Sequence, residues 1–468
     1  MWEIFQSARL RRLFLAETVL LFLVAVLCVR LRIGAGYPGL PPNVELWAYW
    51  REALLAGVAI PVAVQLAMYY LGLYADTQPG SRTQLLVRIQ LAHLVAGVAL
   101  ALLFYLFPHL RLQRLALLLS LGIGQWLLFS LRCHFEEILL SGSWRRRVLI
   151  LGTGGLAQQI GRWLLSRPGA GYELAGFLSP QEPEMAQTLV GRPVLGSYGE
   201  ISEAIQRHNI TDVVFSPDNP RGDEALMNRL LAVKLTGTEV WSALSFTAEL
   251  THSLPIELLH PADVVFDAGF TPSKWTVALK RGNDVVLSLV ALILVSPILL
   301  IVAILIRLDS SGPALYKQPR VGLRGRLFTI YKFRSMKVSK PGEPMRLTSH
   351  NDDRVTRVGR FIRLHRIDEL PQFFNVLLGD MSLVGPRPEV ESSVKELRVS
   401  LPFYDQRHAI RPGITSLGQV RFGAATTLSE ARERLKYDLY YQKNMSLAFD
   451  LSILIDTVKV VLLKIGAR

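Results

Sequence analysis

Cysteine is scarce in this sequence, which has two in 468 residues, Cys28 and Cys133. Both lie in or beside apolar stretches, so the sequence predicts no disulfide framework and no cysteine metal site. Acidic residues are outnumbered: 38 Asp and Glu face 52 Lys and Arg, which gives a net charge of +14. A basic protein usually binds nucleic acid, anionic lipid or phosphorylated small molecules. No stretch interleaves Lys or Arg with aromatic residues as a single-strand nucleic-acid platform does, so nucleic acid is not an expected partner.

Long apolar runs, in contrast, are abundant. Half of the residues are hydrophobic, and the excess is concentrated in the first 140 residues and around residues 285–306. This distribution predicts a membrane protein with soluble parts, whose basic charge suits anionic headgroups and phosphorylated substrates. Gln65 and His93 lie inside the runs, and we expect them to make helix–helix contacts. Four runs are long enough to cross a bilayer as helices: 13–29, 53–74 with an interruption at Pro61, 85–107 and 115–131.

Arginines at the ends of this region predict its orientation. Three precede the first run and three follow the fourth, namely Arg9, Arg11 and Arg12, and Arg145, Arg146 and Arg147. Because cytoplasmic segments carry the excess of Lys and Arg, both ends are expected in the cytoplasm, although the first loop also carries Arg30, Arg32 and Arg51. The first run resembles a secretory signal, but no small-residue cleavage site follows it. We therefore interpret it as an uncleaved anchor.

A glycine turn follows the fourth run. Residues 147–164 read Arg-Val-Leu-Ile-Leu-Gly-Thr-Gly-Gly-Leu-Ala-Gln-Gln-Ile-Gly-Arg-Trp-Leu. An apolar strand, a glycine turn and an amphipathic helix form the first unit of a Rossmann-like fold. Further strands are expected near 173–178 and 212–215, and further helices near 201–208 and 223–235.

Two features of NAD-dependent enzymes are missing from this module. A NAD site needs an acid at the end of the second strand to hold the ribose, but that strand ends at Pro180 and the next acid is Glu182. The chain also has no Tyr-x-x-x-Lys pair, the catalytic pair of one large class of sugar-nucleotide-modifying Rossmann enzymes. We therefore assign no NAD and expect a structural or regulatory role for the module.

A fifth apolar stretch, residues 283–308, follows a proline-containing connector at 251–280. A single crossing would leave basic residues outside the cytoplasm, against the positive-inside pattern. Ser296-Pro297 can break the helix, so we expect a re-entrant hairpin with both ends in the cytoplasm, in which Ser296 is a candidate partner for the freed backbone groups. The alternative is a simple fifth span. The flanking basic residues are Lys280 and Arg281 before the stretch, and Arg307, Lys317, Arg320, Arg324 and Arg326 after it.

Two adjacent carboxylates, Asp368 and Glu369, precede Pro371 and an apolar run. Because proline is tolerated in the first helical turn, the pair is expected at a helix N-terminus, where free N–H groups favour anions such as phosphate. Arg363 and Arg366 add cations just upstream. A nucleophilic carboxylate, a second carboxylate able to hold a divalent metal, and nearby arginines are the parts that phosphoryl transfer needs. Alone, however, such a pair is more often an ordinary helix cap.

Basic loops on either side of the pair suit a nucleotide diphosphate. The first, residues 318–336, has glycines that let backbone N–H groups approach a phosphate, and it carries the cations Arg320, Lys332 and Arg334. In the second, Pro386 and Pro388 flank Arg387. The two prolines fix the backbone on both sides and hold the guanidinium ready for a phosphate.

These motifs resemble one family. Residues from about 272 to the C-terminus are similar to the bacterial sugar transferases, the monotopic phosphoglycosyl transferases. The shared features, in the family's order, are a Ser-Pro-broken helix and the runs Lys-Phe-Arg-Ser-Met, Asp-Glu-Leu-Pro-Gln, Gly-Pro-Arg-Pro and Arg-Pro-Gly-Ile-Thr. The full architecture resembles the family's long members, the polyprenyl-phosphate hexose-1-phosphate transferases that start exopolysaccharide assembly.

The resemblance implies a reaction and roles for named residues. Asp368 is then the nucleophile and Glu369 helps to bind Mg²⁺, while Lys332, Arg363 and Arg387 match positions associated with the phosphates and the nucleotide. The implied reaction transfers a sugar-1-phosphate from a UDP-sugar to polyprenyl (undecaprenyl) phosphate and releases UMP. Its place is the bacterial inner membrane, with the catalytic domain in the cytoplasm and in contact with membrane lipids.

The expected organisation has three parts: a four-span region at 1–140, a Rossmann-like α/β module at 145–260, and a mostly α-helical phosphoglycosyl transferase domain at 272–468 with its re-entrant helix at 283–308. The C-terminal stretch 446–464 is apolar but contains Asp450, Asp456 and Lys459. It is therefore expected to lie on the membrane or to pack on the catalytic domain.

Two local features complete the expectations. Ser416 stands where many family members carry glycine, and it is expected to alter the nearby turn. For Tyr437, Tyr440 and Tyr441, the headgroup level of the membrane and the protein core are about equally good alternatives.

Other functions make different demands on the sequence. A membrane-tethered, NAD-dependent dehydratase or epimerase would need the two missing features named above. A non-enzymatic scaffold for polysaccharide export would need neither Asp368 and Glu369 nor the Gly-Pro-Arg-Pro run. The sequence leaves open which sugar is carried, with a hexose favoured and an N-acetyl sugar as the alternative, and whether the protein is a homodimer.

Overall fold

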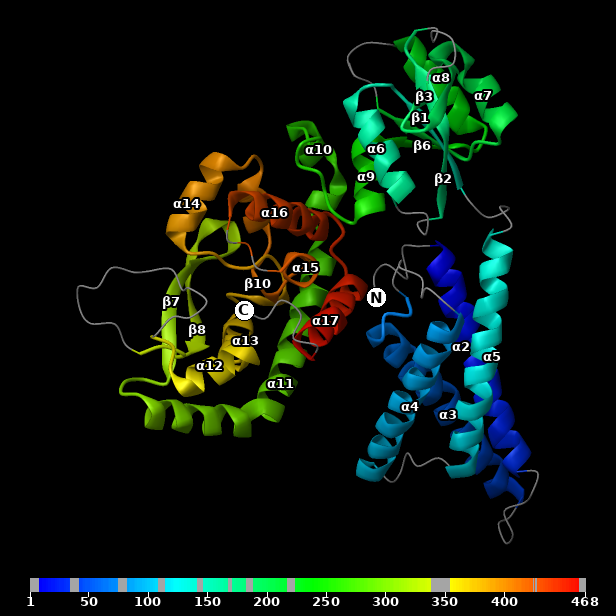
Figure 1. The fold of residues 1–468 in the computed structure, drawn as a ribbon. Helices are drawn as coiled ribbons and strands as arrows, with labels where there is room; N and C mark the ends of the chain where they lie inside the picture. The colour runs from blue at the N-terminus through cyan, green and yellow to red at the C-terminus, as the bar shows by residue number, and fades with distance from the viewer. Residues whose placement is uncertain are drawn as a thin grey trace. The chain divides into compact units, whose positions relative to one another are not determined.

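The structure is a computed structural model that describes residues 8–33, 42–74, 82–107, 114–140, 146–166, 171–181, 188–216, 224–337, 354–423, 425 and 427–462. Arg145 and Glu182, on which two expectations depend, lie outside these residues. The chain forms two compact units, residues 3–243 and 244–468 (Figure 1).

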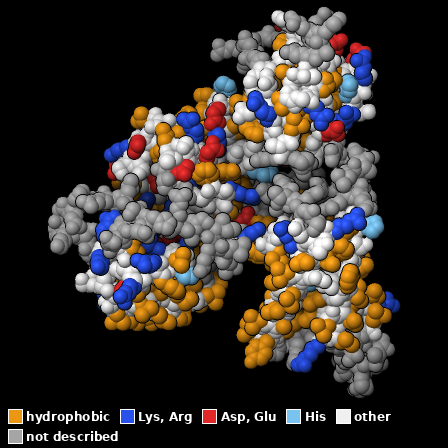
Figure 2. Space-filling model, viewed as in Figure 1, with side chains coloured by type: hydrophobic (Ala, Val, Ile, Leu, Met, Phe, Trp, Pro, Cys, Tyr) orange, Lys and Arg blue, Asp and Glu red, His pale blue; other side chains and the backbone are white. Residues whose placement is uncertain are grey.

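The first unit begins with four long helices, α2 (Ala8–Ile33), α3 (Pro42–Tyr70), α4 (Arg82–Leu106) and α5 (Arg114–Leu140). They coincide with the four apolar runs, and α3 continues as a helix through Pro61. With α11 (Lys274–Asp309), they make five helices long and apolar enough to cross a membrane within the described part of the chain. Figure 2 shows apolar side chains gathered over the four-helix bundle, as expected of a surface that meets lipid.

Two polar side chains inside the runs lie in the interior of the bundle. The Gln65 amide donates to Thr18 Oγ1 at 2.7 Å and to the Phe14 carbonyl oxygen at 3.0 Å, which joins α3 to α2. His93 is buried, and its Nδ1 lies 2.9 Å from the Ile89 carbonyl oxygen one turn earlier in α4. The expected helix–helix contact is confirmed for Gln65.

The bundle also holds a buried ion pair. Glu17 of α2 is fully buried, and Arg132 of α5 donates its Nε–H to the Glu17 carboxylate at 2.6 Å. Tyr74, just after α3, donates its hydroxyl to the same carboxylate at 2.5 Å. Arg132 also donates to the Leu73 carbonyl oxygen at 2.8 Å. The cluster therefore connects three helices, and opposite charges within the first apolar run and directly after the fourth are the sequence signal for it.

Replacing Arg132 with Met is expected to destabilise the bundle by about 3–5 kcal/mol, because the Glu17 carboxylate would stay buried without its partner. The double variant Glu17→Gln/Arg132→Met removes both charges and is expected to recover most of that loss. Thermal unfolding of the protein in lipid nanodiscs measures both. Equal losses in the single and double variants would show that the two charges do not stabilise each other.

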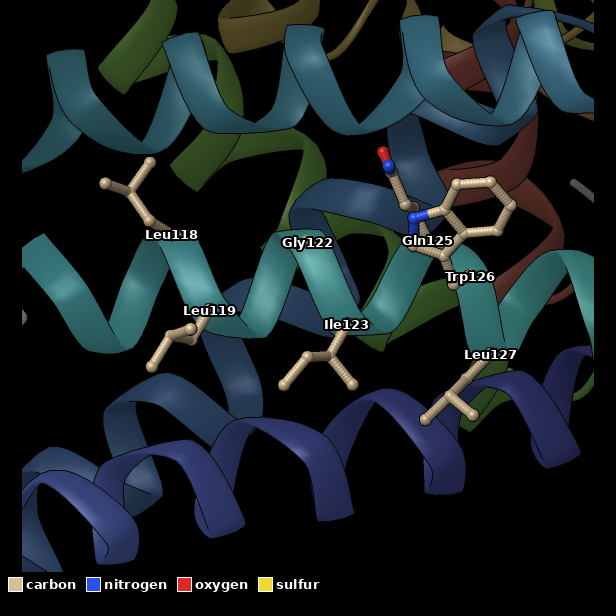
Figure 3. A pocket seen from close by; sticks show the side chains of 7 residues that line it. All are labelled: Leu118, Leu119, Gly122, Ile123, Gln125, Trp126 and Leu127. Carbon is tan, nitrogen blue, oxygen red and sulfur yellow. The ribbon is translucent and has the colours of Figure 1, made fainter.

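A shallow hollow lies on the outside of α5. Figure 3 shows its lining side chains on α5, which runs between α2 and α4. None of these side chains is titratable and most are apolar, so the hollow belongs to the outer surface of the bundle rather than to a catalytic site. The lining residues are Leu118, Leu119, Gly122, Ile123, Gln125, Trp126 and Leu127.

The first unit continues as a Rossmann-like α/β module. Its six-stranded sheet has the order β3-β4-β2-β1-β5-β6, and the neighbouring strands are parallel except for β3 and β4. The expected strands and helices are confirmed as β2, β5, α7 and α8. The elements are β1 (Arg146–Leu151), α6 (Gly155–Ser166), β2 (Tyr172–Ser179), β3 (Thr188–Leu189), β4 (Arg192–Ser197), η3 (Tyr198–Glu200), α7 (Ile201–His208), β5 (Asp212–Phe215), α8 (Glu224–Leu235) and β6 (Glu239–Ser242).

The glycine turn after β1 is required by its surroundings. Gly152 has a φ of +130°, and a Cβ at this position would lie 2.1 Å from the carbonyl oxygen of Ser216, the residue after β5. Only glycine tolerates both the backbone conformation and the close approach. Because β1 pairs with β2 on one side and β5 on the other, the chain order reverses at β1.

The second unit contains Asp368 and Glu369. It begins within α9 (Ala243–Thr251). Its further elements are α10 (Pro261–Phe266), η4 (Ala268–Phe270), α11, β7 (Leu315–Val321), η5 (Leu323–Gly325), β8 (Leu327–Phe333), α12 (Arg357–Leu364), η6 (Ile367–Glu369), α13 (Gln372–Leu378), β9 (Ser382–Val384), α14 (Glu391–Ser400), η7 (Tyr404–Ala409), β10 (Gly413–Thr415), α15 (Leu417–Arg421), α16 (Leu428–Lys443) and α17 (Leu447–Leu462).

The core of this unit draws on segments far apart in the chain. The expected connector, 251–280, contributes several buried apolar side chains to it, so this segment is part of the folded unit. At the other end of the chain, α17 packs on the unit through Phe449 and Ile453, which is the second of the two placements expected for it. Tyr440 and Tyr441 are buried in the same core. The connector's buried residues are Leu254, Ile256, Leu259 and Phe270.

The long helix α11 is continuous and has Pro297 inside it, and Figure 1 shows that it bends. Pro297 has no N–H to offer the Ile293 carbonyl oxygen, and the Ser296 hydroxyl donates to that oxygen at 2.9 Å. The expected role of Ser296 as a partner for a freed backbone group is therefore confirmed. The helix bends without separating into two helices.

The N-terminal half of α11 is anchored by two basic side chains. Arg281 donates to the carbonyl oxygens of Val376 and Leu377, at 2.5 and 2.9 Å, and so caps the C-terminal end of α13. Lys280 forms a buried ion pair with Asp450 of α17 at 2.5 Å. Lys280 and Arg281, the basic residues that precede the apolar stretch, thus form their contacts with other segments of the second unit.

The C-terminal end of α11 is held by Arg334, which corrects the expectation that this residue binds substrate. The chain leaves β8 after Phe333, and Arg334 turns its buried guanidinium toward the last turn of α11. A guanidinium whose N–H groups cap a helix is not free to bind a phosphate. Its acceptors are the carbonyl oxygens of Ile306, Ser310, Ser311 and Gly312.

Candidate active site

Asp368 and Glu369 lie in the short 3-10 turn η6, directly before α13. Arg366, the residue before this turn, has a left-handed backbone with a φ of +54°. Its carbonyl oxygen accepts a hydrogen bond from the Glu369 N–H at 3.2 Å. Pro371 follows as the N-cap residue of α13. The expected position at the start of a helix is therefore confirmed.

One buried side chain ties α13 to β8. Asn375 accepts from the Tyr331 N–H at 3.0 Å and donates to the Thr329 carbonyl oxygen at 2.7 Å. This places Lys332, the next residue of β8, beside η6. Asn375 carries no predicted role in the motif. An amide in the middle of an apolar helix is the signal, because a buried polar group needs partners.

Glu369 is surrounded by cations. Its Oε1 lies 2.9 Å from Lys332 Nζ and 3.2 Å from Arg387 Nη2, and its Oε2 lies 3.9 Å from Arg366 Nη1. Its side chain is only 13% exposed. Burial alone would raise the pKa of Glu369, but Arg387 and Lys332 outweigh it and hold the pKa well below the usual range. Glu369 is therefore permanently ionised at neutral pH.

Asp368 has a different environment, although it is the next residue before Glu369. It is half-buried, and no hydrogen bond or ion pair within the described part of the chain engages its carboxylate. Burial and the adjacent Glu369 charge raise the pKa of Asp368 to about 6, and Lys332, Arg363 and Arg387 only partly offset them. A helix end and the Arg363 charge would favour the ionised form of Asp368, but burial and the neighbouring carboxylate have the larger effect.

The raised pKa of Asp368 predicts an acidic limit to any reaction in which its carboxylate is a nucleophile. Only the ionised form attacks, so the rate is expected to fall about tenfold per pH unit below pH 6. For the reaction that the sequence resemblance implies, the measurement is the first burst of UMP with UDP-sugar at fixed Mg²⁺ and no lipid phosphate. The lipid is omitted because a phosphate monoester also titrates at about pH 6.

One control and one observation isolate this titration. Returning the sample to neutral pH must restore the burst, which separates protonation from unfolding. His408 does not titrate in the same range, because burial and the neighbouring Arg407 lower its pKa to about 4. A burst rate that stays constant on either side of pH 6 would contradict the prediction.

Besides Arg334, four cations were predicted to bind substrate. Three of them lie near the carboxylate pair, and the fourth, Arg320, forms hydrogen bonds elsewhere. Lys332 and Arg387 contact Glu369 directly, and Arg363 of α12 acts on Asp368 through its charge. Arg320 donates instead to the Pro388 carbonyl oxygen at 3.2 Å and to Gln318 Oε1 at 2.8 Å. Pro386 and Pro388 are both buried.

Glu369 is the group best placed to hold a metal. No three His, Cys, Asp or Glu side chains cluster in the part of the chain that the structure describes. Mg²⁺ commonly takes one or two protein carboxylates and completes its shell with water and substrate phosphates. The Oε1 atom of Glu369 is shared by two cations, whereas Oε2 has only the more distant Arg366 contact. The donor set fits a magnesium ion that a diphosphate helps to bind.

Ser416 begins a helix. It is the N-cap residue of α15, and its Oγ accepts a hydrogen bond from the Gln419 N–H at 3.0 Å. A glycine could not make this bond, so the serine stabilises the turn that follows β10.

The site also uses residues that carry no sequence motif of their own. Arg407 of η7 donates to the Arg387 carbonyl oxygen, and Arg434 of α16 donates to Glu389 Oε1 at 2.7 Å. Asp438 of α16 pairs with Arg407 at 2.8 Å. The only sequence signal for these three residues is that they are charged and lie among apolar residues. That signal does not predict which loop each of them contacts.

Comparison with known proteins places this geometry in a family. Residues 275–464 match the bacterial sugar transferase family, and residues 70–216 match a CoA-binding domain family. Over 219 residues, the chain is 44% identical to the UDP-N-acetylgalactosamine-undecaprenyl-phosphate N-acetylgalactosaminephosphotransferase of Aeromonas hydrophila. That alignment covers 47% of this chain and 51% of the Aeromonas protein, so the chain spans about half of its length.

Two other relatives are matched over more of their length. The UDP-glucose:undecaprenyl-phosphate glucose-1-phosphate transferase of Klebsiella pneumoniae is 33% identical over 321 residues, which cover 67% of each chain. An uncharacterized sugar transferase of Haemophilus influenzae is 30% identical over 388 residues, which cover 77% of this chain and 79% of that protein. These matches extend well beyond the carboxylate pair, and they show that this chain belongs to the bacterial sugar transferase family.

Proposed function

We propose that this protein transfers a sugar-1-phosphate from a UDP-sugar to polyprenyl phosphate and releases UMP, as the first step of exopolysaccharide or other glycoconjugate assembly. The observation that carries the proposal is the contrast within the carboxylate pair. Glu369 is held ionised by Lys332 and Arg387, whereas the adjacent Asp368 carboxylate is left without a hydrogen-bond partner in the described structure. One carboxylate is electrostatically fixed and the other is available to attack.

In the first step an oxygen of Asp368 forms a bond to the phosphorus that bears the sugar. The bond from this phosphorus to the bridging oxygen breaks, and its electron pair leaves with UMP. Lys332 and Arg387 face the pair and lower the cost of bringing a diphosphate up to two carboxylates. The product of this step is a phospho-aspartyl intermediate, an acyl phosphate in which the sugar phosphate is joined to the Asp368 carboxylate.

A magnesium ion fits beside Glu369, where it would neutralise charge on the diphosphate of the donor. Glu369 is the ligand on the protein side. Its low pKa keeps it ionised and therefore able to bind a cation over the whole neutral range.

In the second step an oxygen of polyprenyl phosphate forms a bond to the same phosphorus. The bond to Asp368 breaks, its electron pair returns to the carboxylate, and polyprenyl diphosphate-sugar is released. A covalent intermediate allows a water-soluble donor and a lipid acceptor to react in turn at one carboxylate.

The lipid acceptor requires the site to lie at a membrane surface, and α11 supports a re-entrant arrangement there. A straight helix of 36 residues is about 54 Å long. Both ends of α11 are bonded to the second unit, through Arg281 at one end and Arg334 at the other. The bend in Figure 1 and the Ser296 hydrogen bond at Pro297 are consistent with a helix that enters the bilayer and returns. We infer that the second unit lies on the cytoplasmic side of the bacterial inner membrane.

The donor sugar is open to direct measurement. The relatives named above carry glucose and N-acetylgalactosamine in their names, so both belong in the panel of UDP-sugars. Purified protein in nanodiscs, with Mg²⁺ and polyprenyl phosphate, is expected to release UMP continuously with one of them. Without the lipid, the same sugar is expected to give one burst stoichiometric with protein. The absence of UMP with every sugar, from folded and inserted protein, would contradict the proposal.

A further inference from the structure

The loop Pro-Arg-Pro-Glu at 386–389 cannot be held through a ladder of its own amides, because its two prolines have no N–H. Its four carbonyl oxygens each accept a hydrogen bond from another segment of the second unit. Two of the donors are backbone groups. The Gly413 N–H donates to the Pro386 oxygen at 3.0 Å, and the Val321 N–H donates to the Glu389 oxygen at 2.9 Å.

The other two donors are guanidinium groups. Arg407 Nη2 donates to the Arg387 carbonyl oxygen at 2.9 Å, and Arg320 Nη1 donates to the Pro388 carbonyl oxygen at 3.2 Å. Arg407 has the more rigid setting, since its side chain is 4% exposed and that of Arg320 is 19% exposed. The backbone of Arg387 is therefore fixed by a buried charge.

Arg407 is itself held on several sides. Its Nε and Nη2 donate to Asp438 Oδ2 at 3.2 and 2.8 Å, and its Nη1 donates to the Tyr404 hydroxyl at 2.9 Å. The guanidinium also lies 5.2 Å from the centre of the Tyr404 ring. The Asp438 side chain is 2% exposed. A buried guanidinium needs such a counter-ion, and its planar fork fixes the directions of all its hydrogen bonds.

We propose that Arg407 and Asp438 are positioning residues for the transfer reaction: together they fix the Arg387 backbone so that the Arg387 side chain reaches Glu369. The proposal rests on the proposed function, because it gives Arg387 its task at the donor diphosphate. Asp438 orients Arg407, Arg407 orients the Arg387 carbonyl group, and Arg387 Nη2 lies 3.2 Å from Glu369 Oε1. The hydrogen bonds named above for Arg407 and Asp438 do not reach Asp368 or Glu369, so the two residues act on the carboxylate pair through Arg387.

The chemistry of the guanidinium defines the first test. Lysine keeps the charge at position 407, but its single ammonium cannot reproduce the planar fork that reaches Asp438, Tyr404 and the Arg387 oxygen together. Arg407→Lys is therefore expected to lower the burst rate by about 10- to 100-fold, the loss typical of a displaced catalytic group. The matched control is Arg398→Lys, which changes an exposed arginine paired with Asp405 of the same η7 turn. We expect no loss of activity there.

Three further variants keep the test informative if Arg407→Lys folds poorly. Asp438→Asn retains an acceptor oxygen for Arg407 but loses the counter-charge, so it is expected to lower the burst rate less than Asp438→Ala does. Asp438→Ala releases Arg407 and is expected to behave as Arg407→Lys does. Tyr404→Phe removes a single acceptor and leaves the ring, so a smaller loss is expected. Thermal unfolding of each variant is recorded beside its burst rate.

A double-variant cycle with Arg387→Ala distinguishes positioning from general stabilisation. If Arg407 acts through Arg387, then Arg407→Lys causes no further loss once the Arg387 side chain is absent. Losses that multiply in the double variant, or equal losses for Asp438→Asn and Asp438→Ala, would overturn the proposal. A wild-type burst rate in Arg407→Lys, measured under conditions in which Asp368→Asn is inactive, would also overturn the proposal. No burst from the unmodified protein with any UDP-sugar would instead contradict the proposed function.

Discussion

Asp368→Asn is expected to abolish both the burst of UMP and continuous turnover, with a loss of at least about 10³-fold. The substitution is isosteric and removes the anionic oxygen that forms the bond to phosphorus. The remaining groups of the site, including Glu369 and its cations, keep their contacts. Donor binding is therefore expected to survive while the chemical step is lost. UMP release in a stopped assay measures the chemistry, and titration with UDP-sugar measures the binding.

A second readout connects this loss to a covalent intermediate. Intact-protein mass spectrometry of the unmodified protein, mixed with the donor and no lipid, should show one added sugar phosphate, and peptide mapping should place it on Asp368. Asp405→Asn is the matched control, because it makes the same change at an exposed carboxylate of the same unit. Normal turnover in Asp368→Asn would remove Asp368 as the nucleophile and would favour a non-enzymatic or differently organised site.

The position of the carboxylate pair could be predicted from sequence because local rules determine it. A proline three residues after Asp368 and an apolar run beyond it are sufficient to predict the start of a helix. The same holds for Ser296. It directly precedes Pro297, and its hydroxyl therefore reaches the Ile293 carbonyl oxygen that the proline leaves without a backbone donor. The strands and helices of the Rossmann-like module follow from apolar periodicity in the same way.

The electrostatics of the site could not be predicted in this way, because they depend on contacts between distant segments. Lys332 and Arg387 reach Glu369 from β8 and from the loop after β9, and their spacing in sequence does not reveal that they share one oxygen. Arg334 shows the opposite error. It stands two residues after Lys332 in the motif, but the strand ends between them and its side chain turns to the end of α11. A motif predicts which residues matter without giving the direction in which each side chain points.

Glu369→Gln is expected to reduce the burst rate by about 10²-fold or more while leaving Asp368 in place. The amide keeps the shape of the side chain but removes the charge that Lys332 and Arg387 share. Both cations lose their fixed partner, and the ligand proposed for Mg²⁺ loses its negative oxygen. A higher Mg²⁺ requirement should therefore accompany the slower burst. Glu391→Gln is the matched control, because Glu391 pairs with Lys395 at an exposed position of the same unit.

The direction of the pH shift separates this role from a loss of folding. The charge of Glu369 is the second largest cause, after burial, of the raised pKa of Asp368. Removing that charge must therefore lower the pKa of Asp368. The remaining activity of Glu369→Gln should therefore persist to lower pH than that of the unmodified protein, even though the rate at neutral pH is smaller. Partial unfolding would scale the whole profile without moving its acidic limit to lower pH. An acidic limit that stays in place, or moves to higher pH, would show that Glu369 does not act on Asp368 through its charge.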